Sequence, residues 1–231
     1  MRILLVHGAY HGPWCWGRLI PELEKRGHEA VAIDLPIGRA DAGAAEYADV
    51  IASEVTEPDT VVLGHSLSGL AIPLVVERQR PARLVFLCAS LPQPGMSFNQ
   101  LRETETMEPS YQPTTFEFTE LDDGSWMVGA NTATELFYHD LSAADAAWAA
   151  TQLRPQGYRI TSEVTPLSVW PDIPCSYILT RDDRVVDATW ARIAARERLG
   201  TAAIELEGGH SPFLTHPRDL AVAIDRAVGG D

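Results

Sequence analysis

Short apolar runs alternate with amphipathic stretches through the first ninety residues. The runs at 3–6, 30–33, 61–63 and 84–87 contain no polar residue, which is typical of strands buried on both faces. Between them, apolar residues recur every three or four positions, as on the buried side of a helix. The helical positions are Trp16, Leu19, Ile20 and Leu23, then Ala44, Tyr47, Ala48, Ile51 and Val55, and finally 70–76. We expect Gly27 to end the first of these helices.

The same alternation returns in the last sixty residues. Strands are predicted at 175–179 and 202–206, with a helix around Trp190 between them and a closing helix from Pro217. Strands that alternate with helices over short connections form βαβ units, so the sheet should be parallel with helices on both faces. The fold class is therefore α/β. In such sheets the ligand site lies beyond the carboxyl ends of the strands.

The segment 91–171 interrupts this alternation. A small hairpin is predicted from 114–119 and 125–128, and Ser142 with Asp145 forms the N-cap pattern of a helix that runs through Leu153. Its large apolar residues give the segment more apolar surface than a disordered linker carries. They are Trp126, Phe137, Tyr138, Trp148 and Trp170. We therefore predict an inserted cap at 91–171, over a core formed by 1–90 and 172–231.

One serine lies at the point where a predicted strand gives way to a helix. The stretch Gly64-His65-Ser66-Leu67-Ser68-Gly69 follows the strand at 61–63 and precedes the helical run. A strand, a sharp turn and a helix are the context in which G-x-S-x-G acts as a nucleophile elbow. Ser68 replaces the last glycine of that motif and is small enough for the position. A helix N-cap is the competing interpretation of Ser66.

Two further residue types follow at strand ends in the order of a catalytic triad. An aspartate at 182 or 183 comes after one strand, and His210 comes after the last. A serine hydroxyl needs an imidazole to take its proton, and a carboxylate holds the imidazole in the required tautomer. The oxyanion that develops needs two N–H donors, for which the backbone of Leu67 and of Ala9 is placed.

The stretch His7-Gly8-Ala9-Tyr10-His11-Gly12-Pro13-Trp14-Cys15-Trp16 resembles the H-G-A-x-H-G-x-W-x-W opening of the plant methylesterase and hydroxynitrile lyase family of α/β-hydrolases, and of its bacterial relatives. The elbow, parts of 137–156 and Gly209-His210 are also similar to that family. The resemblance implies the α/β-hydrolase fold with a mostly parallel six-stranded sheet, a small cap, a metal-free triad and small ester substrates. The family pattern also implies Asp183 as the triad acid, because it is the fourth residue after its strand. Asp187 is then a helix N-cap, and Asp182 faces solvent.

One departure from that family bears on the reaction. The cyanogenic lyases carry a lysine after the catalytic histidine, and this chain has Ser211 there. We therefore predict a serine carboxylic ester hydrolase. The alternatives are a lyase or other carbonyl chemistry on the same site, and a hydrolase fold that only binds a small molecule. The intact set of serine, aspartate and histidine argues against a pure binding protein.

An apolar pocket for the ester is expected near the N-terminal motif and the cap. The predicted substrate-binding residues are His11, Trp14, Trp126, Phe137 and Tyr138. We expect three other histidines to be structural, namely His7, His28 and His65.

Composition removes several other classes of function. The net charge is −14, from 18 basic and 32 acidic residues, which argues against nucleic acid and against anionic membranes as partners. No Cys/His spacing or glycine-rich phosphate loop suggests a metal or a cofactor, so none is expected. The three cysteines are widely separated, and a strand is predicted to begin at Ile3, so no signal peptide is expected. These features favour the cytoplasm. The oligomeric state is left open, a homodimer included.

Overall fold

A six-stranded parallel sheet forms the centre of the molecule in the computed structural model, which describes residues 1–107 and 111–229. The strand order is β2-β1-β3-β4-β8-β9, and every neighbouring pair is parallel. The strands are β1 (Arg2–Val6), β2 (Glu29–Ile33), β3 (Val61–His65), β4 (Arg83–Leu87), β8 (Cys175–Thr180) and β9 (Ile204–Leu206). The predicted α/β class and the parallel sheet are confirmed. The last strand is shorter than predicted, since it begins at Ile204.

The uninterrupted apolar runs supply two separate cores. Successive residues of a strand point to opposite faces of the sheet. Leu4 and Val6 of β1 therefore belong to one hydrophobic cluster, while Ile3 and Leu5 belong to the other. All four side chains are fully buried. This explains why polar and apolar residues do not alternate along these strands.

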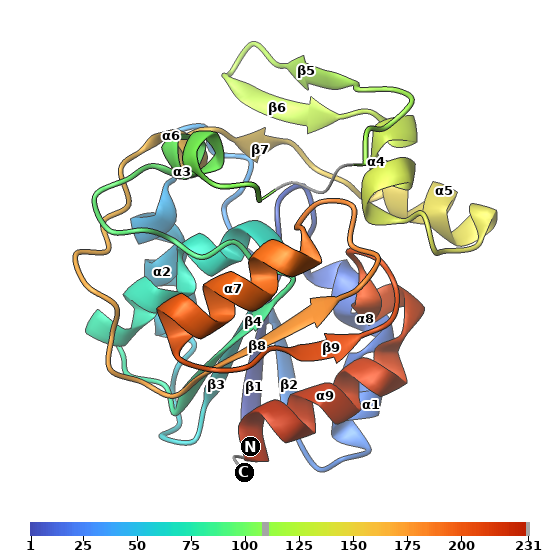
Figure 1. Cartoon of the computed structure of the whole chain (residues 1–231). Helices are drawn as coiled ribbons and strands as arrows, with labels where there is room; N and C mark the ends of the chain where they lie inside the picture. The colour runs from blue at the N-terminus through green and yellow to red at the C-terminus, as the bar shows by residue number, and fades with distance from the viewer. Residues whose placement is uncertain (108–110, 230–231) are drawn as a thin grey trace.

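Helices cover both faces of the sheet (Figure 1). The first cluster contains buried residues of α2 (Ala44–Ser53) and α7 (Ala188–Leu199). The second contains residues of the 3-10 segment η1 (Pro13–Arg18), α1 (Ile20–Glu24), α8 (Pro212–Thr215) and α9 (Pro217–Gly229). Within residues 1–107 and 111–229, no helix is both long and apolar enough to cross a bilayer.

Two helices that the sequence predicts as continuous are broken. The first is divided into η1 and α1, although Gly27, with φ +82°, does follow its end. The helix after Ser66 is two 3-10 segments, η2 (Ser66–Leu70) and η3 (Ile72–Glu77). In both cases a proline, Pro21 or Pro73, stands at the start of the second piece. Proline has no N–H to donate to the preceding turn, so the helix restarts there.

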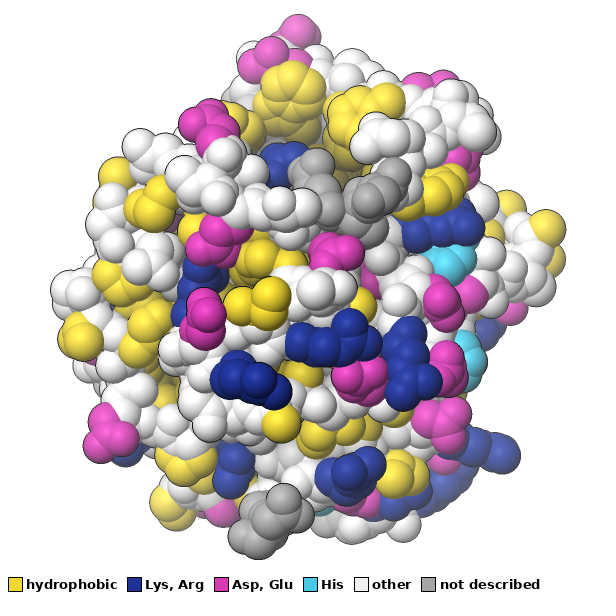
Figure 2. Space-filling model, in the orientation of Figure 1, with side chains coloured by type: hydrophobic (Ala, Val, Ile, Leu, Met, Phe, Trp, Pro, Cys, Tyr) yellow, Lys and Arg dark blue, Asp and Glu magenta, His cyan; other side chains and the backbone are white. Residues whose placement is uncertain are grey.

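The helices and strands between β4 and β8 lie on the side of the molecule opposite the chain termini (Figure 1). They are α3 (Phe98–Thr104), β5 (Phe118–Glu120), β6 (Ser125–Val128), α4 (Ala130–Phe137), α5 (Ala143–Thr151), β7 (Gln156–Gly157) and α6 (Arg159–Ser162). The predicted hairpin is present as β5 and β6, with a shorter first strand, and β7 extends it to a three-stranded sheet. Figure 2 shows hydrophobic side chains gathered on the surface over this hairpin.

Candidate active site

Ser66 stands at a sharp turn between β3 and η2. Its φ of +55° lies in the left-handed region, which a residue with a side chain rarely adopts. A Cβ added to Gly8 would lie 2.8 Å from the Ser66 Cβ, and one added to Gly69 would collide with the Ser90 carbonyl oxygen. The glycines therefore let the turn and its neighbouring loops approach one another closely.

Ser68, which replaces the last glycine of the motif, helps to hold the turn in place. Ser68 is buried, and its hydroxyl lies 2.8 Å from the carbonyl oxygen of His65 and 3.2 Å from that of Val6. It donates its single proton between these two acceptors. Ser68 thereby ties the end of β1 to the turn that carries Ser66.

His210 connects Ser66 to Asp183. The His210 Nε2 lies 2.9 Å from the Ser66 Oγ, and the His210 Nδ1 lies 2.8 Å from the Asp183 Oδ2. The side chains of His210 and Asp183 are each only 2% exposed. A carboxylate can only accept, so Nδ1 carries the proton and Nε2 is free to accept the serine hydroxyl proton. The structure thus brings together three residues that lie as much as 144 positions apart.

Asp183, and not Asp182, faces the imidazole. Its Oδ1 accepts the backbone N–H groups of Val185 at 2.7 Å and Val186 at 3.0 Å. Asp182 is exposed. Asp187 accepts the Trp190 N–H at 2.8 Å and caps α7, as predicted. Backbone hydrogen bonds from the two valines, in addition to their packing, hold the direction of the Asp183 carboxylate.

Both proposed oxyanion donors lie on backbone that meets at Ser66. Leu67 is in the first turn of η2, where N–H groups have no partner within the helix. Ala9 is half-buried in the loop after β1, and its neighbour Gly8 packs against Ser66. These positions fit the two donors that an acyl-transfer site requires.

His11 and Tyr138, both predicted to bind substrate, are buried and bonded to each other. The His11 Nδ1 lies 2.8 Å from the Ala9 carbonyl oxygen, so it carries a proton. Its Nε2 therefore accepts the Tyr138 hydroxyl at 2.8 Å. Burial lowers the pKa of His11 to about 3, which agrees with a neutral ring. The two side chains link the end of α4 to the loop that carries Ala9.

The other predicted pocket residues lie at different depths. The Phe137 ring is 6.0 Å from the His210 ring, and the Trp14 ring stacks on His11 at 5.5 Å. Trp126 is half-buried on β6. No ring contact or hydrogen bond joins Trp126 to Ser66, Asp183 or His210 in the described part of the chain.

Aromatic rings lead outward from His210. Phe137 is followed by Tyr10 at 6.3 Å, by Phe118 at 6.2 Å and by Phe116 at 4.8 Å between ring centroids. Phe137 is 7% exposed, and Phe116 is 74% exposed. The row therefore reaches from the base of the site to the surface of the hairpin.

Two further side chains, His65 and Asp140, are hydrogen-bonded to the backbone of Gly209 and His210. The His65 Nε2–H donates to the His210 carbonyl oxygen at 2.9 Å, and burial lowers the pKa of His65. Asp140, between α4 and α5, accepts the Gly209 N–H at 2.7 Å. His65 was expected to be structural, and here it holds the backbone of His210. Its place beside Ser66 in the motif is a signal for this role, whereas Asp140 has none.

Within residues 1–107 and 111–229, no group of three or more His, Cys, Asp or Glu side chains is arranged to hold a metal ion. Both ring nitrogens of His7 and of His11 are hydrogen-bonded to protein groups. His7 contacts Gly8 and Leu35, and His11 contacts Ala9 and Tyr138.

Comparisons with known proteins agree with this architecture. A model of the alpha/beta hydrolase family matches residues 3–223. The chain is 26% identical to the alpha/beta hydrolase nvfD of Aspergillus novofumigatus, over 99% of the chain and 96% of that protein. It is 24% identical to methyl jasmonate esterase 1 of Vitis vinifera, over 97% of the chain and 95% of that esterase. The solved structure of the methylesterase MES16 from Arabidopsis has the same fold, with a TM-score of 0.78, 22% identity and 99% coverage of both chains.

Proposed function

The chain belongs to the alpha/beta hydrolase family, and from this membership and the geometry around Ser66 we propose that it is a serine-dependent carboxylic ester hydrolase. The observation that supports the proposal is the pair of hydrogen bonds that connects the Ser66 Oγ to His210 and His210 to Asp183. These groups lie at the carboxyl ends of parallel strands, where this class of fold binds its ligands. Similarity over nearly full length to a protein named as an esterase supports the same reaction.

The proposed reaction follows from the tautomer of His210. Its Nε2 takes the Ser66 proton as the oxygen attacks the ester carbonyl carbon. The resulting oxyanion is stabilised by the N–H groups of Ala9 and Leu67. When the tetrahedral intermediate collapses, His210 returns the proton to the departing alcohol, which leaves the acyl group on Ser66. Water then repeats the two steps and releases the carboxylic acid.

Asp183 sets the tautomer of His210 during this cycle. Its carboxylate faces the Nδ1–H of His210, so the ring cannot present a proton to Ser66 before the attack. The same carboxylate stabilises the imidazolium that forms during the attack.

We further propose a small, largely apolar ester as the substrate. The row of rings from Phe137 to Phe116 supports this choice, since it offers flat apolar surface beside His210. Ser211, next to His210, is fully buried and uncharged, so the site offers no cation there to a departing cyanide. We therefore expect little cleavage of mandelonitrile, and rapid cleavage would favour the lyase instead.

Hydrolysis of p-nitrophenyl butyrate by the wild type and by Ser66→Ala tests this function. Loss of one triad member costs on the order of 10⁴ to 10⁶ in rate, so the variant should be close to inactive. Circular dichroism should show that it remains folded, since alanine removes only one oxygen atom. A folded variant that retains more than about a tenth of the wild-type kcat would contradict the proposal.

A further inference from the structure

His7 bonds to the peptide group that carries one of the proposed oxyanion donors. Its Nδ1 lies 2.9 Å from the Gly8 carbonyl oxygen, which can only accept, so Nδ1 carries a proton. The Gly8 carbonyl and the Ala9 N–H belong to the same peptide group. His7 is fully buried, so water does not compete for this hydrogen bond.

The planarity of the peptide makes this bond a constraint on Ala9. A peptide group is rigid and trans, so its N–H points opposite to its carbonyl. Fixing the direction of the Gly8 carbonyl therefore fixes the direction of the Ala9 N–H. The next peptide is held as well, because the His11 Nδ1–H donates to the Ala9 carbonyl oxygen at 2.8 Å. Both peptide planes that meet at the Ala9 Cα are thus held by buried imidazoles.

The far side of the His7 ring is fixed by donors. The Leu35 N–H donates to the His7 Nε2 at 3.1 Å, which matches the tautomer with the proton on Nδ1. The Arg154 Nη2 lies 3.5 Å from the same nitrogen. Burial lowers the pKa of His7 to about 4 against its ordinary value of 6.5, so the ring is neutral.

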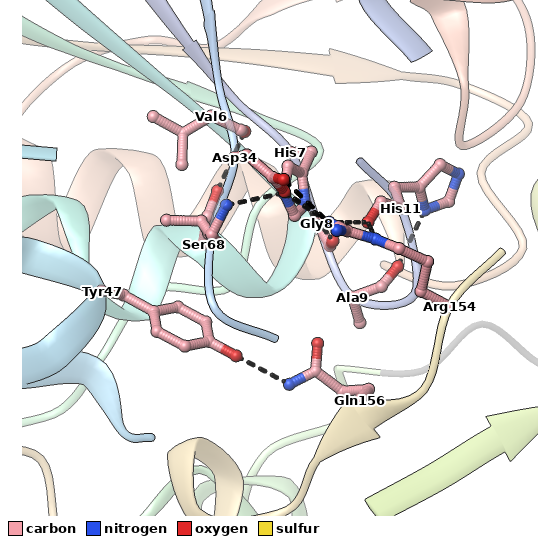
Figure 3. Close-up of polar contacts among 11 residues, drawn as sticks. Val6, His7, Gly8, Ala9, His11, Asp34, Tyr47, Ser68, Arg154 and Gln156 are labelled. Atoms are coloured by element: carbon pink, nitrogen blue, oxygen red, sulfur yellow. Dashed lines mark hydrogen bonds and ion pairs between the residues drawn. The ribbon is translucent and has the colours of Figure 1, made fainter. Parts of the chain in front are cut away.

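Arg154 reaches from the cap across this whole loop (Figure 3). Its guanidinium donates to the His11 carbonyl oxygen at 3.1 Å and to the Asp34 carboxylate at 2.6 Å. Its own backbone N–H donates to the Tyr10 carbonyl oxygen at 2.7 Å. Arg154 therefore contacts His7, the Asp34 carboxylate and the backbone of the two residues that follow Ala9.

We propose that His7 and Arg154 are positioning residues for oxyanion stabilisation: His7 orients the Ala9 N–H through the Gly8 carbonyl, and Arg154 holds His7 and the loop 8–11 in that arrangement from the cap. The inference rests on the proposed esterase function. It assigns to a motif histidine a role in the reaction, although His7 touches no reacting atom. It also makes the donor geometry depend on the position of the cap.

The first test compares His7→Phe with His7→Asn. Phenylalanine fills the space without a donor, whereas the asparagine Nδ2 stands where the His7 Nδ1 stood and can still donate to the Gly8 carbonyl. Loss of one oxyanion donor costs about 10² to 10³ in kcat, so His7→Phe should lose about 10², with KM changed by less than about threefold. His7→Asn should recover kcat to within about tenfold of the wild type.

Two ketones separate orientation from general loss of structure. Propyl trifluoromethyl ketone adds to Ser66 and forms an oxyanion, whereas propyl methyl ketone binds mainly as the unreacted carbonyl. In His7→Phe, affinity for the trifluoromethyl ketone should fall by the same factor as kcat/KM, and affinity for the methyl ketone should not change. Equal losses for both ketones would mean a merely structural role and would overturn the inference.

Arg154→Met provides a second arm that does not depend on a buried substitution. The Arg154 side chain is 38% exposed, so methionine should be tolerated. We expect a roughly tenfold loss of kcat, as for removal of charge-assisted hydrogen bonds, again with selective loss of trifluoromethyl ketone affinity. Arg159→Met is the matched control, because Arg159 joins the cap to Glu46 and Asp41, away from His7, at 45% exposure. Its kcat should stay within about twofold of the wild type.

The outcomes separate this inference from the proposed function. If the wild type hydrolyses the ester and Ser66→Ala does not, the function stands and the His7 and Arg154 variants decide the inference. A folded His7→Phe with kcat near the wild type, or an Asn variant no better than the Phe variant, overturns the inference alone. If His7→Phe does not fold, equal activities of Arg154→Met and Arg159→Met overturn it. An inactive wild type contradicts both.

Discussion

The Asp183 carboxylate uses its two oxygens for different purposes. Oδ2 makes the shorter contact to His210, at 2.8 Å, and Oδ1 accepts two backbone N–H groups from the following valines. An amide at this position would present an N–H to one of these donors. The geometry therefore requires an acceptor on both sides, which a carboxylate supplies and an amide does not.

Replacement of Asp183 by asparagine should lower kcat far more than the same replacement of Asp182. Asp183→Asn should lower kcat by roughly 10⁴, and at least by 10². The amide would hold His210 in the wrong tautomer, as the same substitution does in serine proteases. Asp182→Asn should cost less than about tenfold, since its side chain is exposed. The two variants should be measured side by side on one ester at neutral pH. If Asp182→Asn is the impaired one, the assignment of the acid is wrong.

The sequence predicts the triad because each member follows a strand, and strand ends converge in a parallel sheet. The proposed role of His7 could not be found in this way. His7 also follows a strand, but its partners are a carbonyl, an N–H and an arginine 147 positions away. Only the folded backbone places these groups together, and none has a characteristic spacing.

At the scale of elements, the turn at Ser66 depends on close packing of η2 against the loop after β4. Gly69 leaves no space for a Cβ, because the Ser90 carbonyl oxygen occupies it. The Ser90 N–H in turn donates to the Ser66 carbonyl oxygen at 3.1 Å. A shift of this loop would therefore move Ser66.

Gly69→Ala should destabilise the protein by about 1 to 3 kcal/mol, the usual cost of overpacking a filled space, and should lower kcat as well. Gly17→Ala is the control, because a Cβ there meets nothing within 4 Å and alanine is the better helix former. Urea unfolding of both variants measures the difference. Equal stability of the two variants would show that the contact with Ser90 is not needed.

Patterns of hydrophobicity predict strands better than helices in this chain. The apolar runs at 3–6 and 84–87 mark buried strands because each face of the sheet meets its own core, whereas the run at 30–33 forms the edge strand β2, in which only Ile33 is buried. The same patterns cannot show where Pro21 and Pro73 divide a helix into shorter pieces. They also miss β7, since two residues are too few to carry a period.

At the scale of the whole molecule, several histidines are buried in the neutral form. Burial lowers the pKa of His7 to about 4 and that of His11 to about 3, and it also lowers the pKa of His65. In the unfolded chain each of them has an ordinary pKa near 6.5. Below that pH the unfolded state binds more protons than the folded state, so acid favours unfolding.

The free energy of unfolding should therefore be constant near pH 7 to 8 and fall as the pH drops below about 6.5. Each histidine contributes up to about 1.4 kcal/mol per pH unit, down to about pH 4 for His7 and about pH 3 for His11. Urea titrations between pH 8 and pH 5 measure this loss. His7→Asn should fall less steeply than the wild type, and identical slopes would contradict a neutral buried His7.

The proposed mechanism requires that Ser66 carries the acyl group during turnover. The most direct measurement is the mass of the wild-type protein, and of its peptide containing Ser66, after rapid acid quenching during turnover of p-nitrophenyl butyrate. We expect this peptide to gain one butyryl group in the wild type, and no acyl group to be found in Ser66→Ala. An acyl group on another residue, or steady turnover by a folded Ser66→Ala variant, would contradict this mechanism.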